Sequence, residues 1–320
     1  MNAAAAQDRD AQALRRTLEA LESIVLGKSP QVRLCLSCLL ARGHLLIEDV
    51  PGVGKTTLAH ALAQVLGLAW QRVQFTSDLL PADIIGVSIF DRASQQFTFR
   101  QGPIFTQLLL ADEVNRASPR TQSALLEAME ERQVSVDLTT YRLSEPFFVV
   151  ATQNPHEQLG TFPLPESQLD RFLMRVTLGY PDAVHERELL KTGDRRDLIP
   201  RLEPVLGPEA VIRAQEAVRS THVSEPLLDY AQRLIARTRE RSDLKLGLSP
   251  RAGQGLIRGA QAWARLAGRT AVLPEDVQAV LPAVITHRLE RRDTGRSDPP
   301  GSTTRGDLAE ELIRSVPVPF

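Results

Sequence analysis

The stretch EDVPGVGKTT, residues 48–57, follows the apolar run Leu45-Leu46-Ile47 and constrains the fold more than any other part of the chain. Its end, Gly54-Lys55-Thr56, matches the second half of the phosphate-loop signature G-x-x-x-x-G-K-[ST]. In such a loop, backbone N–H groups and the positive end of the following helix hold phosphate, and the lysine reaches the β and γ phosphates. The sequence predicts a buried strand, a phosphate loop and a helix over about 55–66.

One position of this loop departs from the signature. Asp49 stands where the first glycine is expected, and its charge is unfavourable beside phosphate unless the side chain points away or pairs elsewhere. Gly52 and Gly54 would still let the backbone approach the phosphates. Taken alone, the incomplete match leaves open both a nucleotide site and a simple turn. The loop residues that we expect to bind the cofactor are Gly52, Val53, Gly54, Lys55, Thr56 and Thr57.

Two further apolar runs end in polar residues of the right chemistry. Leu108 to Ala111 leads into Asp112-Glu113, and residues 147–151 lead into TQNP, which contains Asn154. Unbroken apolarity is typical of strands covered on both faces, and helical stretches such as 119–132 would supply the crossovers of a parallel sheet. Ligands of open α/β sheets bind beyond the carboxyl ends of the strands. The three runs therefore predict one shared site.

The chemistry of that site follows from its side chains. We expect the hydroxyl of Thr56 and the carboxylate of Asp112 to hold Mg²⁺, the latter through its water shell, as in other phosphate-loop NTPases. Glu113 would polarise the attacking water. Asn154 would orient that water against the γ-phosphate, although an Asn-Pro pair is also a common turn.

The chain of 320 residues is long enough for more than one domain. Strand signals fade after about residue 183, and helical patterns recur over 208–220, 225–241, 250–267 and 274–289. The polar, breaker-rich segment 291–307 reads as a linker, before a short apolar-faced end that would dock back on the body. We expect an α/β core over 1–182, a helical domain over 183–290, and a linker with a tail over 291–320.

Charge, composition and cysteine spacing argue against several other functions. The net charge of -1 and the aromatic content of 5% argue against a nucleic-acid partner. Cys35 and Cys38 form a C-x-x-C pair, which suits a redox or half-zinc site, but they share one face of an apolar helical segment, and we interpret them as buried apolar residues. The N-terminus lacks the features of a secretion signal and no long apolar run could span a membrane, so we expect a cytoplasmic protein without a membrane partner.

The ordered blocks HLLIEDVPGVGKTTLA, QGPIFTQLLLADEVNRASPRTQSALLEAMEE, FFVVATQNP, FPLPESQLDRFLMRV, LGLSPRAGQGLIRGAQAWA and LPEDV cover roughly residues 20–290. Together they resemble the MoxR family of AAA+ ATPases. This resemblance implies a phosphate-loop NTPase αβα core with a parallel sheet, followed by a small all-helical lid. Members of the family tolerate an acidic residue at the Asp49 position, so the phosphate loop is expected to work.

The resemblance also assigns roles to arginines. Arg171 in LDRF aligns with the arginine finger, which reaches the γ-phosphate of a neighbouring subunit, and Arg251 in SPRA aligns with the second sensor arginine, which closes the lid on bound nucleotide. Arg116 in VNRA is a weaker candidate for a contact between subunits. The segment SIVLGK around Gly27 resembles the part of the family that lines the adenine pocket.

The resemblance implies a ring, usually hexameric, with ATP and Mg²⁺ between subunits. It also implies a chaperone-like role in assembling or remodelling protein partners, commonly with a partner that carries a von Willebrand factor A domain. Residues 76–105 resemble the family's insert, with a hairpin that turns at RASQQ and either contacts client protein or only decorates the core. The alternative function is an ATP-gated scaffold with little turnover. A nucleic-acid translocase and a GTPase rank below both.

Overall fold

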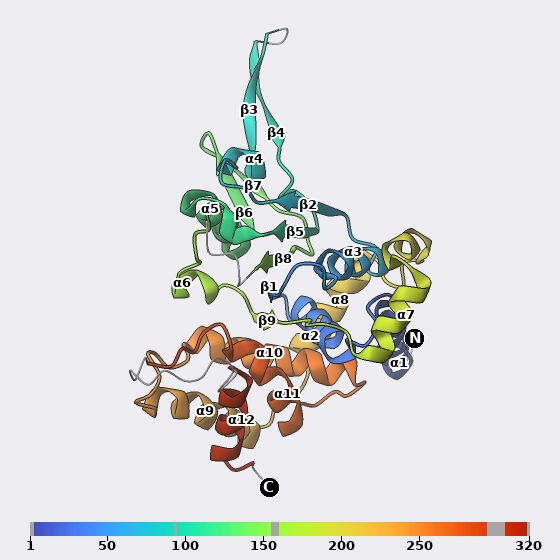
Figure 1. The fold of residues 1–320 in the computed structure, drawn as a ribbon, viewed down its shortest axis with the longest axis vertical. Helices are drawn as coiled ribbons and strands as arrows, with labels where there is room; N and C mark the ends of the chain where they lie inside the picture. Colours follow the sequence, from blue (N-terminus) through green and yellow to red (C-terminus); the bar gives the residue numbers. More distant parts are fainter. Residues whose placement is uncertain (1–2, 93–94, 155–159, 293–304, 319–320) are drawn as a thin grey trace.

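The computed structural model describes residues 3–92, 95–154, 160–292 and 305–318. Its centre is a five-stranded sheet of order β2-β5-β8-β1-β9, in which every neighbouring pair is parallel (Figure 1). The strands are β1 (Leu45–Glu48), β2 (Trp70–Gln74), β5 (Leu108–Asp112), β8 (Phe148–Gln153) and β9 (Met174–Val176). The strands predicted from apolar runs are all present, and their carboxyl ends share one edge of the sheet.

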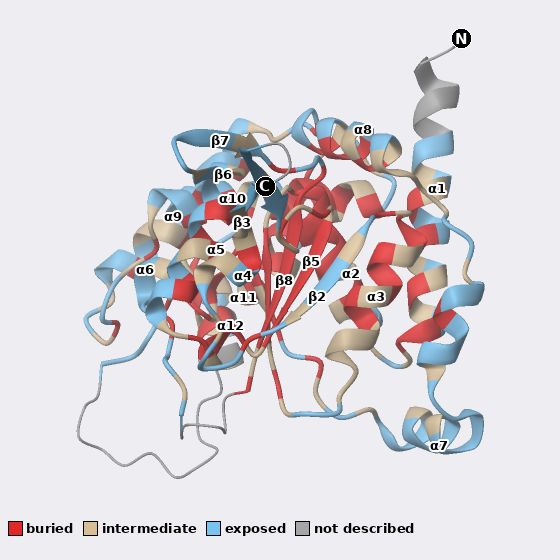
Figure 2. Ribbon diagram, turned by 90° about the horizontal axis from the view of Figure 1, so that it is seen from above, coloured by how far each residue is buried: buried red, intermediate tan, exposed pale blue. Residues whose placement is uncertain are grey.

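Alternate strand residues face the two sides of this sheet, as the period of a strand requires. On β1, Leu45 and Ile47 belong to one buried apolar cluster and Leu46 to the other. The first cluster includes α1 (Ala3–Ile24), α2 (Ser29–Leu40) and α3 (Lys55–Val65), and the second includes α4 (Pro81–Ile85) and α5 (Pro119–Glu131). Figure 2 shows the buried strands between these two helical layers. The predicted αβα core is confirmed.

After β9 the described residues form helices and no further strand of the sheet. They are α7 (Ala183–Thr192), the 3₁₀ segment η2 (Arg195–Arg201), α8 (Pro208–Arg219), α9 (Glu225–Glu240), α10 (Pro250–Leu266), α11 (Pro274–Ile285) and α12 (Arg305–Ser315). The lid is thus helical, as predicted, and α10 packs on α2 of the core. The division of the chain at residues 182 and 290 remains our proposal.

The C-terminal end docks on the helical part, as the sequence predicts. In α12, Leu308, Ala309 and Leu312 are buried, and the helix packs against α11 and α9. The predicted linker 291–307 lies mostly outside the described residues. None of the helices in the described part is long and apolar enough to cross a lipid bilayer.

Two hairpins extend from the core. The first, β3 (Gly86–Asp91) with β4 (Gln96–Gln101), projects away from the body at the end opposite the helical lid (Figure 1). Residues 93–94 of the predicted turn RASQQ lie outside the described residues. The two strands beside it expose Phe90 and Phe97, whose ring centroids lie 5.2 Å apart. The second hairpin, within residues 132–146, consists of β6 (Gln133–Val136) and β7 (Thr139–Arg142).

Candidate nucleotide-binding site

The phosphate loop joins β1 to α3. Gly52 and Gly54 have left-handed backbone conformations, with φ of 85° and 93°. A β-carbon added at either position would contact nothing within 4 Å, so the requirement for glycine is set by the backbone conformation. Lys55 is the first residue of α3, and its Nζ donates to the carbonyl oxygens of Asp49 at 2.6 Å and Val50 at 3.3 Å. The ammonium group of Lys55 is therefore bonded to the backbone of the phosphate loop, where we expect phosphate to bind.

Asp49, the residue that departs from the signature, is buried, and both of its carboxylate oxygens accept backbone hydrogen bonds. Its Oδ1 accepts a hydrogen bond from the Val50 N–H at 2.8 Å, and its Oδ2 accepts one from the Gly179 N–H at 2.6 Å. Gly179 follows β9, which is the neighbour of β1 in the sheet. The carboxylate thus satisfies two backbone donors and joins the phosphate loop to the next strand's exit, which explains how an acidic residue is accommodated there.

Asp112 lies at the end of β5 and is held from both sides. Its Oδ1 accepts a hydrogen bond of 2.6 Å from the Thr152 hydroxyl of β8, and its Oδ2 accepts bonds from Arg72 of β2 at 3.1 Å (Nε) and 2.7 Å (NH2). Asp112 is nearly buried, whereas Arg72 is about half exposed. Sequence reasoning missed both partners. Arg72 lies outside the motifs that it used, and Thr152 lies in TQNP, where only Asn154 was singled out.

Glu113 is held in a similar way. Its Oε2 accepts a hydrogen bond from Gln74 Nε2 at 2.8 Å and pairs with Arg116 Nε at 3.0 Å, while its own N–H donates to the Thr152 hydroxyl oxygen at 2.8 Å. Its φ of 57° lies in the left-handed region, which is strained for a residue with a side chain. Arg116, the weaker candidate for a subunit contact, thus contacts Glu113 of its own chain.

The residues predicted to hold a metal ion have the chemistry that Mg²⁺ prefers. The Thr56 hydroxyl and the Asp112 carboxylate are hard oxygen donors, and Mg²⁺ in phosphate-loop sites takes few protein ligands and completes its shell with water and phosphate. The described residues contain no cluster of three or more His, Cys, Asp or Glu side chains that could form an all-protein metal site. The donor set therefore fits an ion shared with a nucleotide. Asn154, at the end of β8, is buried close to this edge.

A cavity of about 470 Å³ adjoins the phosphate loop. Gly52, Val53, Gly54 and Thr57 line it on one side. Ile24 to Leu26 and Lys28, from the segment that resembles the adenine pocket, line it as well, together with Tyr180 and residues of α7 and η2. Lys28 Nζ donates to the Tyr180 carbonyl at 2.6 Å and Arg196 Nε to the Thr57 hydroxyl at 3.2 Å. The cavity has the size and mixed lining of a nucleotide pocket.

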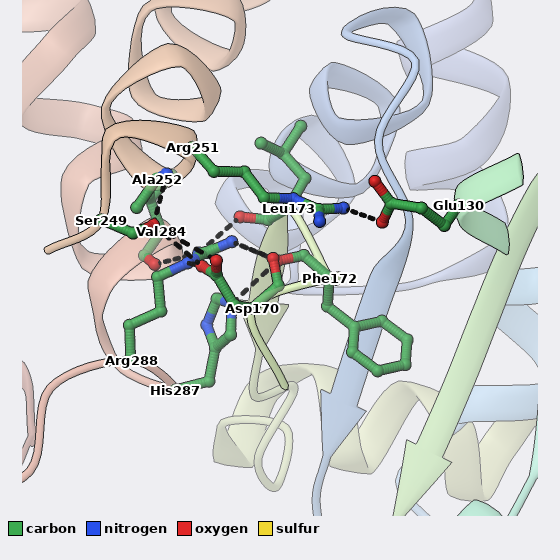
Figure 3. Close-up of polar contacts among 10 residues, drawn as sticks. All are labelled: Glu130, Asp170, Phe172, Leu173, Ser249, Arg251, Ala252, Val284, His287 and Arg288. Carbon is green, nitrogen blue, oxygen red and sulfur yellow. Dashed lines mark hydrogen bonds and ion pairs between the residues drawn. The ribbon is translucent and has the colours of Figure 1, made fainter. Parts of the chain in front are cut away.

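Arg171 and Arg251 lie apart from this cavity, and neither lines it. Arg171 follows the short helix α6 (Glu166–Leu169) and borders a different cavity together with Glu127 and Glu131 of α5. Arg251, in the first turn of α10, pairs with Glu130 of α5 (Figure 3). Both arginines are thus on the α5–α6 side of the molecule, across the sheet from α3 and α7 (Figure 1).

Contacts around Asp170 fix the helical lid to this side. Arg288 Nε donates to Asp170 Oδ1 at 2.7 Å, and the Ser249 hydroxyl lies 3.2 Å from Asp170 Oδ2 (Figure 3). His287 Nε2 lies 2.9 Å from the Phe172 carbonyl oxygen. Arg288 is nearly buried, and this burial lowers its pKa. The residue next to the predicted arginine finger is therefore bonded directly to two lid segments.

The two cysteines are buried apolar residues, as expected. Both are free and buried in α2, and burial raises the pKa of the Cys35 thiol to about 12. A thiol with such a pKa is a poor nucleophile and a poor metal ligand at neutral pH. The interpretation of the C-x-x-C pair as core packing is supported.

A phosphate loop after β1, acidic residues after β5, a polar residue after β8 and a helical lid define an AAA+ ATPase. Residues 44–174 match the model of the ATPase family associated with various cellular activities (AAA), and residues 236–310 match the AAA lid domain. The chain is 43% identical to the uncharacterized protein YeaC of Bacillus subtilis, over 95% of this chain and 92% of that one.

Two named relatives narrow this class to one family. The chain is 41% identical to the chaperone MoxR1 of Mycobacterium tuberculosis, over 86% of this chain and 75% of that one. It is 36% identical to the protein MoxR of Paracoccus denitrificans, over 89% and 88%. A crystal structure of a candidate ATPase from Cytophaga hutchinsonii superposes with a TM-score of 0.89 at 34% identity, covering 99% of this chain and 98% of that one. The chain belongs to the MoxR family of AAA+ ATPases.

Proposed function

We propose that this protein binds ATP with Mg²⁺ beside the phosphate loop and hydrolyses it at the junctions of a hexameric ring. AAA+ ATPases generally form oligomeric rings, and membership of the family supports a ring of this chain as well. The observation that carries the proposal is the position of Arg171 and Arg251, both outside the cavity that the phosphate loop lines. Cations on that side can serve the nucleotide of an adjoining subunit.

The roles of this chain's residues follow from their positions. The loop N–H groups around Gly54 and the ammonium of Lys55 would bind the phosphates, and Thr56 and Asp112 would hold Mg²⁺, which offsets the charge of the phosphates. Glu113 would accept a proton from the attacking water. For this, its carboxylate must leave Gln74 and Arg116, which hold it in the described conformation.

Asn154 would orient that water, and Arg171 of a neighbouring subunit would stabilise the negative charge that develops on the γ-phosphate. An arginine finger of this kind contributes about 10³–10⁵ in rate in phosphoryl transfer. We propose that Arg251 also acts on the nucleotide of a neighbouring subunit, since its guanidinium pairs with Glu130 on the same side of the molecule as Arg171.

We further propose that the cycle remodels or assembles protein partners in the cytoplasm, with a partner that carries a von Willebrand factor A domain. One relative is named a chaperone, which supports a protein client. The projecting β3–β4 hairpin, with Phe97 about three-quarters exposed, offers an apolar surface for it.

Phosphate release measured on mixed subunits tests the proposal. Lys55→Ala should abolish nucleotide binding, and Arg171→Ala should bind ATP but lose turnover. When the two inactive variants are mixed, a ring contains junctions with an intact phosphate loop from one subunit and an intact arginine from the other. Activity should therefore reappear in the mixture. The control mixes Lys55→Ala with the double variant Lys55→Ala/Glu113→Gln. No subunit of this control has an intact phosphate loop, so activity should not reappear. Normal turnover by Arg171→Ala alone, or no recovery in the first mixture, contradicts the proposal.

The second candidate is a ring that assembles on ATP and barely hydrolyses it. The observation that favours it is that side chains of β2 hold both acidic residues, Arg72 on Asp112 and Gln74 on Glu113. If wild type and Glu113→Gln release phosphate at the same slow rate, the scaffold is the better description. A clear difference between them supports hydrolysis.

A further inference from the structure

A cavity of about 220 Å³, lined by arginines, lies near the amino end of β1, at the opposite end of that strand from the phosphate loop. Four elements that are distant in sequence bring its cations together: the end of α2, the end of α5, the end of α8 and the middle of α10. Its lining residues are Arg42, Arg132, Arg219 and Arg258, with Leu40, Ala41 and Val218 as the apolar part.

The positive charges of this arginine cavity are poorly balanced. Glu145 lies 3.0 Å from Arg42 NH2 and 4.0 Å from Arg132 NH1, so one carboxylate serves two guanidinium groups. Among the described residues, neither Arg219 nor Arg258 has a carboxylate within ion-pair distance. Burial and the charge of Arg42 lower the pKa of Arg132. Like charges this close disfavour one another unless an anion lies between them.

Two of the arginines occupy backbone conformations that do not suit them. Arg42 has a φ of 56° just after α2, and Arg132 has a φ of 52° where α5 ends. Glycine or asparagine is the favoured residue at such helix ends, because a β-carbon is strained in the left-handed region. Arg132 NH2 also donates to the Arg42 carbonyl at 3.1 Å, which joins the two helix ends. Both arginines line the same cavity.

We propose that the arginine cavity binds a small phosphate-type oxyanion, a phosphate or diphosphate group. The guanidinium fork matches phosphate oxygens with paired charged hydrogen bonds, which an ammonium group cannot do. The volume suits a diphosphate but falls below the range of pockets that hold a whole nucleotide. The site is separate from the proposed ATP site, since the two cavities share no lining residue.

Calorimetric titration with inorganic pyrophosphate and with inorganic phosphate tests this site. The full chain should carry Lys55→Ala, which removes phosphate binding by the loop and keeps the outcome independent of the proposed ATPase. In this background we expect one pyrophosphate per chain. Adding Arg219→Gln and Arg258→Gln should weaken binding at least about tenfold, because each lost guanidinium removes a charged hydrogen bond.

The matched control replaces Arg213 and Arg233 with glutamine, since both are exposed on α8 and α9 and neither lines the cavity. This control changes the net charge equally and should leave the affinity unchanged. The altered side chains are exposed, so the variants should fold. Arg258→Lys alone keeps the charge but should still weaken binding, because an ammonium group cannot make the paired hydrogen bonds of a guanidinium group. Equal weakening by test and control, or no pyrophosphate binding by the Lys55→Ala protein, overturns the proposal. Tighter binding of an acidic peptide than of pyrophosphate also overturns it, in favour of a protein carboxylate.

Discussion

The Asp49 carboxylate in the phosphate loop accepts a hydrogen bond of 2.6 Å from the backbone N–H of Gly179, 130 positions further along the chain. This bond and the one from Val50 make Asp49 a structural residue of the loop. Asp49→Gly would restore the usual signature but leave two backbone donors without their acceptor. We expect it to lower the free energy of unfolding by about 1–3 kcal/mol, the cost of such unsatisfied groups.

Urea unfolding of Asp49→Gly, Asp49→Asn and wild type measures this effect. Asparagine keeps one acceptor oxygen, so its loss should be smaller than that of glycine. ATP affinity should change little in either variant. If Asp49→Gly binds ATP much more tightly at unchanged stability, the carboxylate acts on phosphate through its charge and the structural role is wrong.

The Arg72–Asp112 pair predicts a competition with Mg²⁺. Both would use the carboxylate of Asp112, whose Oδ2 lies 2.7 Å from Arg72 NH2. Arg72→Gln should therefore bind Mg²⁺·ATP at lower Mg²⁺ concentration, with a half-saturation point reduced up to about fivefold, as the pair is partly exposed and weak. Fluorescent-ATP binding against Mg²⁺ concentration measures it, with Arg100→Gln on the exposed hairpin as the control. A higher Mg²⁺ requirement in Arg72→Gln would show that Arg72 positions Asp112 instead.

His44 gives the protein a stability that depends on pH. It is buried, it accepts the Val149 N–H on Nδ1 at 3.0 Å, and its Nε2 lies 3.1 Å from the Met129 carbonyl oxygen. This arrangement fits the neutral ring, and burial lowers the pKa of His44 to about 4 from 6.5. In the unfolded chain the ring takes up a proton at higher pH than in the folded one. Stability is therefore complete above about pH 6.5 and falls as the pH drops toward 4.

The expected loss from His44 over that interval is about 3 kcal/mol, since each pKa unit corresponds to about 1.4 kcal/mol. Unfolding by urea between pH 7.5 and 4.5 should show it in wild type. His44→Gln, which cannot take up a proton, should be less stable at pH 7.5 and have a flatter profile. Parallel profiles of the two proteins would assign the pH dependence to other groups.

The Asp170–Arg288 pair should contribute strongly to folding. Arg288 is only 6% exposed, and without Asp170 its charge would be left in a poorly hydrated place. We expect Asp170→Ala to lower the free energy of unfolding by about 3 kcal/mol. Lys245→Ala, which breaks an exposed pair with Glu290, is the control and should cost under about 1 kcal/mol. Similar losses in the two variants, measured by urea unfolding, would contradict a special role for Asp170.

The sequence predicted the strands that carry chemistry because they are covered on both faces. The runs before Asp49, Asp112 and Asn154 are continuous and apolar, and each is a central strand of the sheet. It did not predict β2. This strand is at the edge of the sheet and exposes Gln71, Arg72 and Gln74, so it has no apolar run to recognise.

The partners of the site residues were beyond the reach of motif reasoning. Thr152 contacts Asp112 and Glu113 because β8 lies beside β5, and that neighbourhood follows from strand order. Likewise, the motif around Arg251 identifies a family position, whereas its pairing with Glu130 depends on where the first turn of α10 lies relative to the end of α5. Sequence motifs identify the site residues, whereas the packing of strands and helices determines which side chains contact them.

The contacts of Asp170 with Arg288 and Ser249, and of Glu130 with Arg251, fasten the helical lid to the edge of the core that bears Arg171. These contacts oppose bending between the lid and this edge of the core. In a ring, a change around the nucleotide would then open or close the interface between two subunits. The movement would pass from one subunit to the next with little bending inside each chain.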